Sequence, residues 1–218
     1  MTVALLKAMQ LADTSFPTGG FGFSWGLESA VAAGVVTRLT FDAWLETELL
    51  DRWANFDRVI LAEAWQRPLD TFADYEAEVD VLFWSEPLRQ HSVRAGHAFL
   101  VGTQRFGDPA AATLKDMCRK DAAHGHLSPV QGAVFASQRL PLELAIAAAA
   151  HGAVQALTSA AVRLSLISAL EAQRAYTALQ PSLAAVMEAP ARGTTPTSFA
   201  PLSEMAMLTP PSAPLFMN

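Results

Sequence analysis

The stretch Phe41–Ala64, FDAWLETELLDRWANFDRVILAEA, carries the pattern that decides the fold. Its large apolar residues recur every three or four positions, at Phe41, Trp44, Leu45, Leu49, Trp53, Phe56 and Ile60. An α-helix has 3.6 residues per turn, so these side chains share one face while charged residues occupy the rest. The stretch therefore predicts one long amphipathic helix over residues 41–65. We expect the hydroxyl of the preceding Thr40 to cap this helix by accepting a backbone N–H, and Asp42 to favour the positive end of its dipole.

The remainder of the chain repeats this organisation. Helical periodicity predicts further helices near residues 2–12, 24–33, 71–84, 87–105, 110–123, 130–138, 142–166 and 169–188. Gly34 and Gly107 are placed to end helices, and prolines at 129 and 141 are placed in first turns, where a missing N–H costs nothing. Pro87 should either lie in a first turn or kink its helix. No stretch alternates apolar and polar β-branched residues between turns, so no strand is predicted. The expected fold is an all-α, single-domain bundle of about nine to ten helices with a flexible C-terminal tail.

Composition limits the ligands and compartments to be expected. The chain has 218 residues, of which 51% are hydrophobic and 17% charged, and its net charge is -6. A negative chain without long runs of Lys or Arg does not attract phosphate backbones, so no nucleic acid partner is expected. The single Cys118 cannot form an internal disulfide, and Lys7 and Asp13 interrupt what would be the apolar core of a signal peptide. We therefore expect a cytoplasmic protein, part of whose apolar surface faces a partner.

One window tests whether the chain enters a membrane. Residues Leu144–Val162 carry no formally charged side chain and are nearly long enough to span a bilayer. The window consists mostly of alanine, with His151, Gln155 and Thr158 among the polar exceptions, so its driving force for lipid is weak. We predict a helix buried in the protein core, and no membrane association.

Two segments differ from the helical pattern. Residues Leu11–Trp25, LADTSFPTGGFGFSW, form a glycine-rich loop in which aromatic residues need burial against the protein or a partner. From Pro190 onward the sequence is rich in Pro, Thr and Ser, with PARGTTPTSF followed by TPPSAP. The predicted organisation is an all-helical domain over residues 1–189, then a linker, a short helix over Phe199–Leu208 and a docking tail over residues 190–218. Leu215 and Phe216 would be the apolar plug of that tail.

No pattern indicates catalysis, and we expect no enzyme, no cofactor and no metal site. GGFGFSWG does not match GxGxxG, and no GxxxxGK[ST] occurs. His124 and His126 flank a glycine without a second cysteine or a carboxylate in register, which favours a surface loop at a helix end over a metal centre. His91 and His97 lie on different sides of a helix, as a solvated and a half-buried histidine, and no serine lies in GxSxG.

Three segments together resemble one protein family. They are LLKAMQLADTSFPTGGFGFSWGLESAVAAGVV (Leu5–Val36), SEPLRQHSVRAGHAF (Ser85–Phe99) and SAAVRLSLISALEAQRA (Ser159–Ala175). The order of the first helix, the PTGGF loop and the S-x-G-L-E helix start is similar to the opening of urease accessory protein F, the UreF family. The other two segments place Arg89, Arg163 and Gln173 on matching family positions, so the resemblance covers nearly the whole chain.

The resemblance implies a non-enzymatic scaffold in urease maturation. Family members pair as homodimers and bridge two other accessory proteins, UreD (also called UreH) and the GTPase UreG. Their complex delivers nickel to apo-urease under the control of GTP hydrolysis. The resemblance points to Glu28, Arg163, Arg89, Gln173, Leu215 and Phe216 as partner-binding residues, with Glu28 and Arg163 facing UreG and the two tail residues docking on UreD.

The chain departs from the family pattern in two places. Leu166, Ser168 and Ala169 replace Pro, Gly and Gln, which favours a straighter helical connection there. At the C-terminus the family's charged ending is missing, although Leu215 and Phe216 keep its apolar part. The alternative from another class is a soluble or membrane-associated helical bundle that binds a small apolar ligand around the alanine-rich helix, and a minor variant of the scaffold role has His124 and His126 binding nickel.

Overall fold

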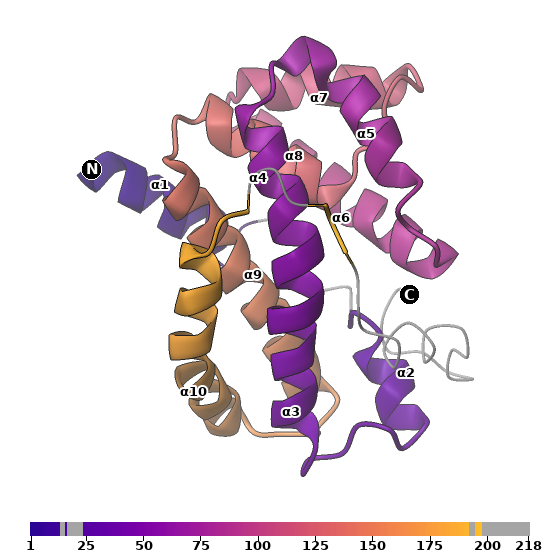
Figure 1. Ribbon diagram of the computed structural model, residues 1–218, viewed down its shortest axis with the longest axis vertical. Helices are drawn as coiled ribbons and strands as arrows, with labels where there is room; N and C mark the ends of the chain where they lie inside the picture. Colours follow the sequence, from indigo (N-terminus) through magenta and orange to yellow (C-terminus); the bar gives the residue numbers. More distant parts are fainter. Residues whose placement is uncertain (14–15, 17–23, 192–194, 198–218) are drawn as a thin grey trace.

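The computed structural model describes residues 1–13, 16, 24–191 and 195–197, and over these residues the protein is helical without a strand (Figure 1). The elements are α1 (Thr2–Ala12), α2 (Leu27–Ala32), α3 (Phe41–Glu46), the π-helix η2 (Thr47–Asp57), α4 (Arg58–Gln66), the 3-10 helix η3 (Leu69–Thr71), α5 (Phe72–Asp80), α6 (Glu86–Arg105), α7 (Pro109–Arg119), α8 (Leu127–Ser137), α9 (Leu142–Arg163) and α10 (Ala169–Glu188). The predicted all-α class and the helices predicted between residues 2 and 188 are confirmed, whereas the short helix predicted over Phe199–Leu208 lies outside the described residues.

The long helix predicted from Phe41 exists, but its middle is wound differently from its ends. α3, η2 and α4 continue into one another through the centre of the molecule (Figure 1). Over Thr47–Asp57 the backbone bonds pair residues five apart, in place of the four that the periodicity predicted. The wider turns change which side chains meet, and the functional site depends on this change.

The predicted cap at Thr40 is wrong. Thr40 does precede α3, but its hydroxyl makes no bond to the helix. It accepts instead from the backbone N–H of Thr37, at 2.9 Å, in the turn before the helix. Backbone N–H groups on both sides of a threonine can donate to its hydroxyl, and here the donor comes from the preceding turn.

Helix ends follow the predicted glycines and prolines closely. Gly34 and Gly107 have φ of +71° and +82°, the left-handed conformation that ends a helix at low cost for glycine. Pro87 and Pro129 lie in the first turns of α6 and α8. Pro141 is the residue before α9.

The tightest helix packing joins α4 to α8. A Cβ on Gly132 of α8 would lie 2.4 Å from the carbonyl oxygen of Leu61 and 2.8 Å from the Cβ of Ala64. Only a residue without a side chain lets the two backbones approach this closely. Around this contact the core contains large, fully buried side chains from many elements, among them Phe41, Leu49, Phe99, Leu114, Phe135 and Leu157.

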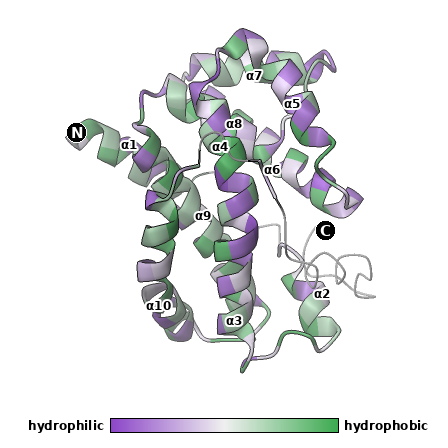
Figure 2. Ribbon diagram, viewed as in Figure 1, coloured by the Kyte–Doolittle hydropathy of each residue, from purple (hydrophilic) through white to green (hydrophobic). Residues whose placement is uncertain are grey.

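α9 is the predicted buried helix. It is the one helix in the described part of the chain that is long and apolar enough to cross a membrane. However, 56% of its most apolar window is buried inside the protein, where it packs against α1, α10, α4 and η2. Figure 2 shows hydrophobic colouring along this helix, consistent with a core position.

The connection between α9 and α10 corrects the prediction of a straighter helix. α9 ends at Arg163, and Ser165 takes a positive φ of 56°. α10 begins with a capping box, in which Ser168 accepts from the Glu171 N–H and the Glu171 side chain accepts from the Ser168 N–H. Glu171 also forms a salt bridge with Arg38. The bend is therefore kept by local capping, without the family's Pro and Gly.

Candidate functional site

The π-helical segment holds a buried group of charges at the centre of the protein. Arg52 is 6% exposed, and its Nε donates to Glu48 Oε2 at 2.7 Å while its Nη1 donates to Asp57. The second contact joins residues five apart, which the π-turn brings onto one face. Burial alone would lower the pKa of Arg52, but Asp57 and Glu48 outweigh it and raise that pKa. The guanidinium is thus permanently charged and fixed in place.

Two rings cover this charge group. The guanidinium of Arg52 lies 5.0 Å from the ring centroid of Trp25, and Trp25 stacks on His91 with centroids 4.4 Å apart. His91 is buried, and its burial together with the charges of Arg52 and Arg94 lowers its pKa to about 3. His91 is therefore a neutral imidazole near pH 7, not the solvated or half-buried histidine expected at this position. His97, on another side of α6, is exposed.

A cavity of about 110 Å³ opens beside these residues. Small side chains of α9, such as Ala149 and Ala153, form part of its wall, and Trp25, His91 and Arg163 also line it. Burial lowers the pKa of Arg163. The cavity has the volume of one large apolar side chain, and its lining is mostly apolar with a few polar groups.

A second organised region surrounds the carboxylate of Glu76 on α5. Glu76 is fully buried and accepts hydrogen bonds from three successive backbone N–H groups, those of residues 124–126. This loop also fits closely on α6, since a Cβ on Gly96 would lie 2.0 Å from the Gly125 carbonyl oxygen. Gly125 itself has a φ of +83°. The carboxylate and the two glycines together fix the loop against α5 and α6.

Asp80 continues this network towards the surface. Its Oδ1 lies 2.9 Å from His126 Nε2 and 3.2 Å from Arg89 Nη1. Partial burial works against the charge of Asp80, but the hydrogen bonds from His126 and Arg89 prevail and lower its pKa. Burial lowers the pKa of His126, although Asp80 and Glu76 oppose the effect. Arg89 also bonds Glu86, whose pKa it lowers with Gln90 to about 2.

The histidine loop differs from the expected surface loop. His126 is fully buried against Phe83, with ring centroids 4.6 Å apart, whereas His124 is half exposed. Over the part of the chain that the structure describes, no group of three or more His, Cys, Asp or Glu side chains has the arrangement to hold a metal ion. His126 is engaged with Asp80 and is a structural residue of this loop.

The residues predicted to bind partners come from four different helices and from the C-terminal segment. Glu28 lies in the first turn of α2 and is 4% exposed, and Arg163 ends α9. Arg89 lies on α6 within the Asp80 network, and Gln173 is exposed on α10. Leu215 and Phe216 lie outside the described residues. The role of all six residues in partner binding stays a prediction.

Sequence reasoning missed the two charge groups at Arg52 and Glu76. The charge group at Arg52 could have been predicted from the sequence. The apolar face of its helix is so wide that some of the charged residues Glu48, Arg52 and Asp57 must be buried with it. No local signal existed for the second, since Glu76 bonds atoms about fifty residues away in the chain.

The chain is similar in sequence to proteins of one family. The family model described as UreF matches residues 35–180 of the chain. A urease accessory protein UreF from Allorhizobium ampelinum is 33% identical over 180 residues, which cover 76% of this chain and 74% of that protein. A protein of the same name from Agrobacterium fabrum is 34% identical over 74% of this chain and 70% of its own length. Another from Mesorhizobium japonicum is 28% identical over 88% and 85% of the two chains.

Proposed function

Because this chain belongs to the UreF family of urease accessory proteins, we propose that it is a non-enzymatic scaffold that bridges UreD (UreH) and the GTPase UreG. In that role it regulates the GTP-dependent delivery of nickel, as cargo, to apo-urease, and it works in the cytoplasm. The observation that carries the proposal is the family match over residues 35–180, which spans most of the described helices.

The internal use of the buried charges supports a scaffold over an enzyme. Arg52 donates hydrogen bonds to two carboxylates, and the Glu76 carboxylate accepts hydrogen bonds from three backbone N–H groups. A catalytic acid or base needs a free lone pair or proton directed at a substrate. These groups instead fix helix and loop positions, which is what a protein that presents surfaces to partners requires.

The exposed face of α1 supports pairing as a homodimer. α1 projects from one side of the molecule, and only Ala8 of its residues is buried (Figure 1). Val3, Leu5, Leu6 and Met9 are all exposed, as the hydrophobic colouring in Figure 2 shows for this helix. Contiguous exposed apolar residues of this kind mark protein interfaces. A second copy of the chain is the proposed occupant, and light scattering of the purified protein tests it.

The scaffold role is tested by co-purification and by urease activation in the same cells. We expect the tagged full-length chain to co-purify with UreD and UreG, and urease activity to fall to background in cells that lack it. The purified chain should neither bind nor hydrolyse GTP in the absence of UreG, because it has no phosphate-binding loop. The matched control is the same cells re-supplied with the wild-type chain. Failure to recover UreD and UreG, with the chain folded and abundant, would refute the scaffold role.

The 110 Å³ cavity favours the alternative of a ligand-binding bundle. A ligand protein should be stabilised by a small apolar probe such as benzene in proportion to its concentration. If the chain activates urease and the probe does not stabilise it, the scaffold role is supported. If the probe stabilises the chain saturably and loss of the gene leaves urease activity unchanged, the ligand-binding role is supported.

A further inference from the structure

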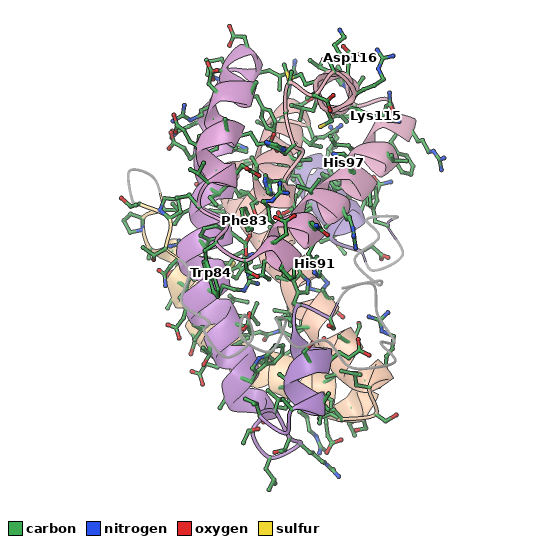
Figure 3. All side chains as sticks on the ribbon, turned by 90° about the vertical axis from the view of Figure 1, so that its right-hand side faces the viewer. Phe83, Trp84, His91, His97, Lys115 and Asp116 are labelled. Atoms are coloured by element: carbon green, nitrogen blue, oxygen red, sulfur yellow. The ribbon has the colours of Figure 1, made fainter. Side chains whose placement is uncertain are left out.

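An apolar patch interrupts the polar surface at the connection between α5 and α6. Val81 is 79% exposed and Trp84 is 59% exposed, with Leu82 exposed between them. Phe83 turns inward from the same connection and packs on His126 and on the ring of Phe56. Figure 3 labels Phe83 and Trp84, the two neighbouring aromatic residues of this connection. A large aromatic side chain left in water at a well-packed corner indicates a contact surface.

Beside Trp84 the surface is hollowed into what we term the Trp84 groove. Phe56, Leu82, Trp84 and Leu88 provide its apolar walls, and the polar side chains of Arg52, Asp57, Ser85 and Ser92 also line it. The Ser85 side chain is 2% exposed, and its Oγ has no hydrogen-bond partner among the described residues. The apolar walls of the groove, with Trp84 exposed beside them, suit the apolar side chains of a peptide segment.

The described chain ends beside this groove. Arg58 Nη1 donates to the carbonyl oxygens of Val186 and Ala189 at 2.7 and 2.8 Å, which fixes the end of α10 on the long central helix. Further on, the N–H of Thr197 donates to the carbonyl oxygen of Asn55 at 2.9 Å. Asn55 directly precedes Phe56, a wall of the groove. The backbone of Thr197 therefore lies against the residue that precedes a wall of the groove.

The sequence that follows Thr197 matches the groove in chemistry. Residues 199–208 read FAPLSEMAML, in which Glu204 is the single charge. Phe199, Leu202 and Met205 recur every three positions, as on one face of a helix, and Pro201 is placed for a first turn. Phe199 follows Thr197 by two residues, a reach of at most about 7 Å. It can contact a surface that begins at Phe56.

We propose that residues 199–208 of this chain occupy the Trp84 groove, with Phe199 and Leu202 against Trp84 and Leu88. The tether at Thr197 makes the contact intramolecular, so a modest apolar contact suffices to fill the groove. Residues 209–218, with Leu215 and Phe216, would then leave the protein from this face. The contact would thus determine which face of the molecule lies nearest to a partner that binds the tail, whatever the identity of that partner.

Hydrogen exchange of the full-length chain tests the contact. The amides of residues 199–208 should exchange at least about tenfold more slowly than in a free peptide of that sequence, because a docked segment must open before it exchanges. The variants Trp84→Ala and Phe199→Ala should abolish this protection. The control Val81→Ala removes an exposed side chain that does not line the groove and should leave the protection intact. All variants should keep the wild-type melting temperature within a few degrees, since none removes a buried described side chain.

A photo-cross-link distinguishes this chain's own tail from that of a second copy. With a benzophenone-bearing phenylalanine at position 199, cross-links should form to residues 82–88 of the same chain. Mixing isotopically labelled and unlabelled protein identifies links between copies. The proposal is overturned by unprotected amides in the wild type, by protection that survives Trp84→Ala, or by cross-links that fall elsewhere or only between copies.

Discussion

Arg58 and Ala189 are joined across the fold, because the Arg58 guanidinium donates to the Ala189 carbonyl oxygen at 2.8 Å from more than a hundred positions earlier in the chain. The same nitrogen bonds the Val186 carbonyl oxygen, and Arg58 Nε bonds the Ala54 carbonyl oxygen at 2.9 Å. The last carbonyls of a helix have no partner within the helix. A single buried arginine therefore satisfies the end of α10 and attaches it to the central helix.

Replacing this arginine should destabilise the protein. Arg58→Met keeps most of the buried volume but leaves the α10 carbonyls without their donor, which should cost about 2–3 kcal/mol of unfolding free energy. Urea unfolding followed by circular dichroism measures the change. Arg174→Met, at an exposed position on α10, is the control and should change stability by less than about 0.5 kcal/mol. Equal effects of the two substitutions would contradict the assigned role.

Glu76→Gln should loosen the loop of residues 124–126. An amide offers one acceptor atom and directs an N–H₂ group at the backbone donors, so at least one buried N–H loses its partner, at a cost of about 2–3 kcal/mol. The exposed neighbour Glu78→Gln is the matched control. Hydrogen exchange should show faster exchange of the His124, Gly125 and His126 amides in the first variant alone. Unchanged protection there would show that the loop is held by other contacts.

Two glycine substitutions should have opposite signs. Gly132→Ala places a methyl group 2.4 Å from the Leu61 carbonyl oxygen and must separate α4 from α8, so we expect a loss of about 1–3 kcal/mol. Gly152→Ala, in α9, meets no atom within 4 Å and should gain about 0.5–1 kcal/mol, because alanine favours the helix. Thermal melting of both variants measures the difference. A destabilised Gly152→Ala variant would mean that its wall of the cavity is occupied.

The stability of the protein should fall as the pH drops below neutrality. Burial lowers the pKa of His91 from 6.5 to about 3, so the unfolded chain binds a proton there that the folded chain does not. The contribution of His91 is complete above pH 6.5 and is lost progressively towards pH 3. One such group costs about 2 kcal/mol between pH 6.5 and pH 5. Urea unfolding at pH 7 and pH 5 should show this loss, and His91→Phe should reduce it, leaving the smaller part that His126 contributes. Parallel losses in both proteins would refute the assignment.

The proposed UreG contacts at Arg163 and Glu28 need different substitutions. Arg163 is exposed at the end of α9, so Arg163→Ala should keep the melting temperature within a few degrees. If it faces UreG, recruitment should fall at least about thirtyfold, as for a charge pair that loses one partner. Glu28 is 4% exposed, so truncation to alanine should destabilise the fold, and Glu28→Gln is the more informative variant. Retained UreG binding by both variants would place the interface elsewhere.

How far the sequence predicts this protein depends on the range of the interaction. The long helix from Phe41 could be predicted because apolar residues at helical spacing must share one face. The cap at Thr40 could not, since the N–H of Thr37 and those of α3 compete for the same hydroxyl and the final geometry decides. The bend before α10 differs from the predicted straighter helix. Ser168 and Glu171 have the spacing of a capping box, and that pattern indicates a helix start at this position.

The sequence by itself determined the helices, their apolar faces, the buried α9 and the family, because periodicity, helix ends and contiguous motifs are properties of neighbouring residues. Only the tertiary structure decided that η2 widens to join Arg52 with Asp57, that Glu76 binds the loop of residues 124–126, and that His126 is buried on Asp80 and Phe83. Those contacts join residues distant in sequence, or they depend on the change from α-helical to π-helical hydrogen bonding within a packed helix. A buried charge must find its partners wherever the fold brings donors, and no local pattern records where that is.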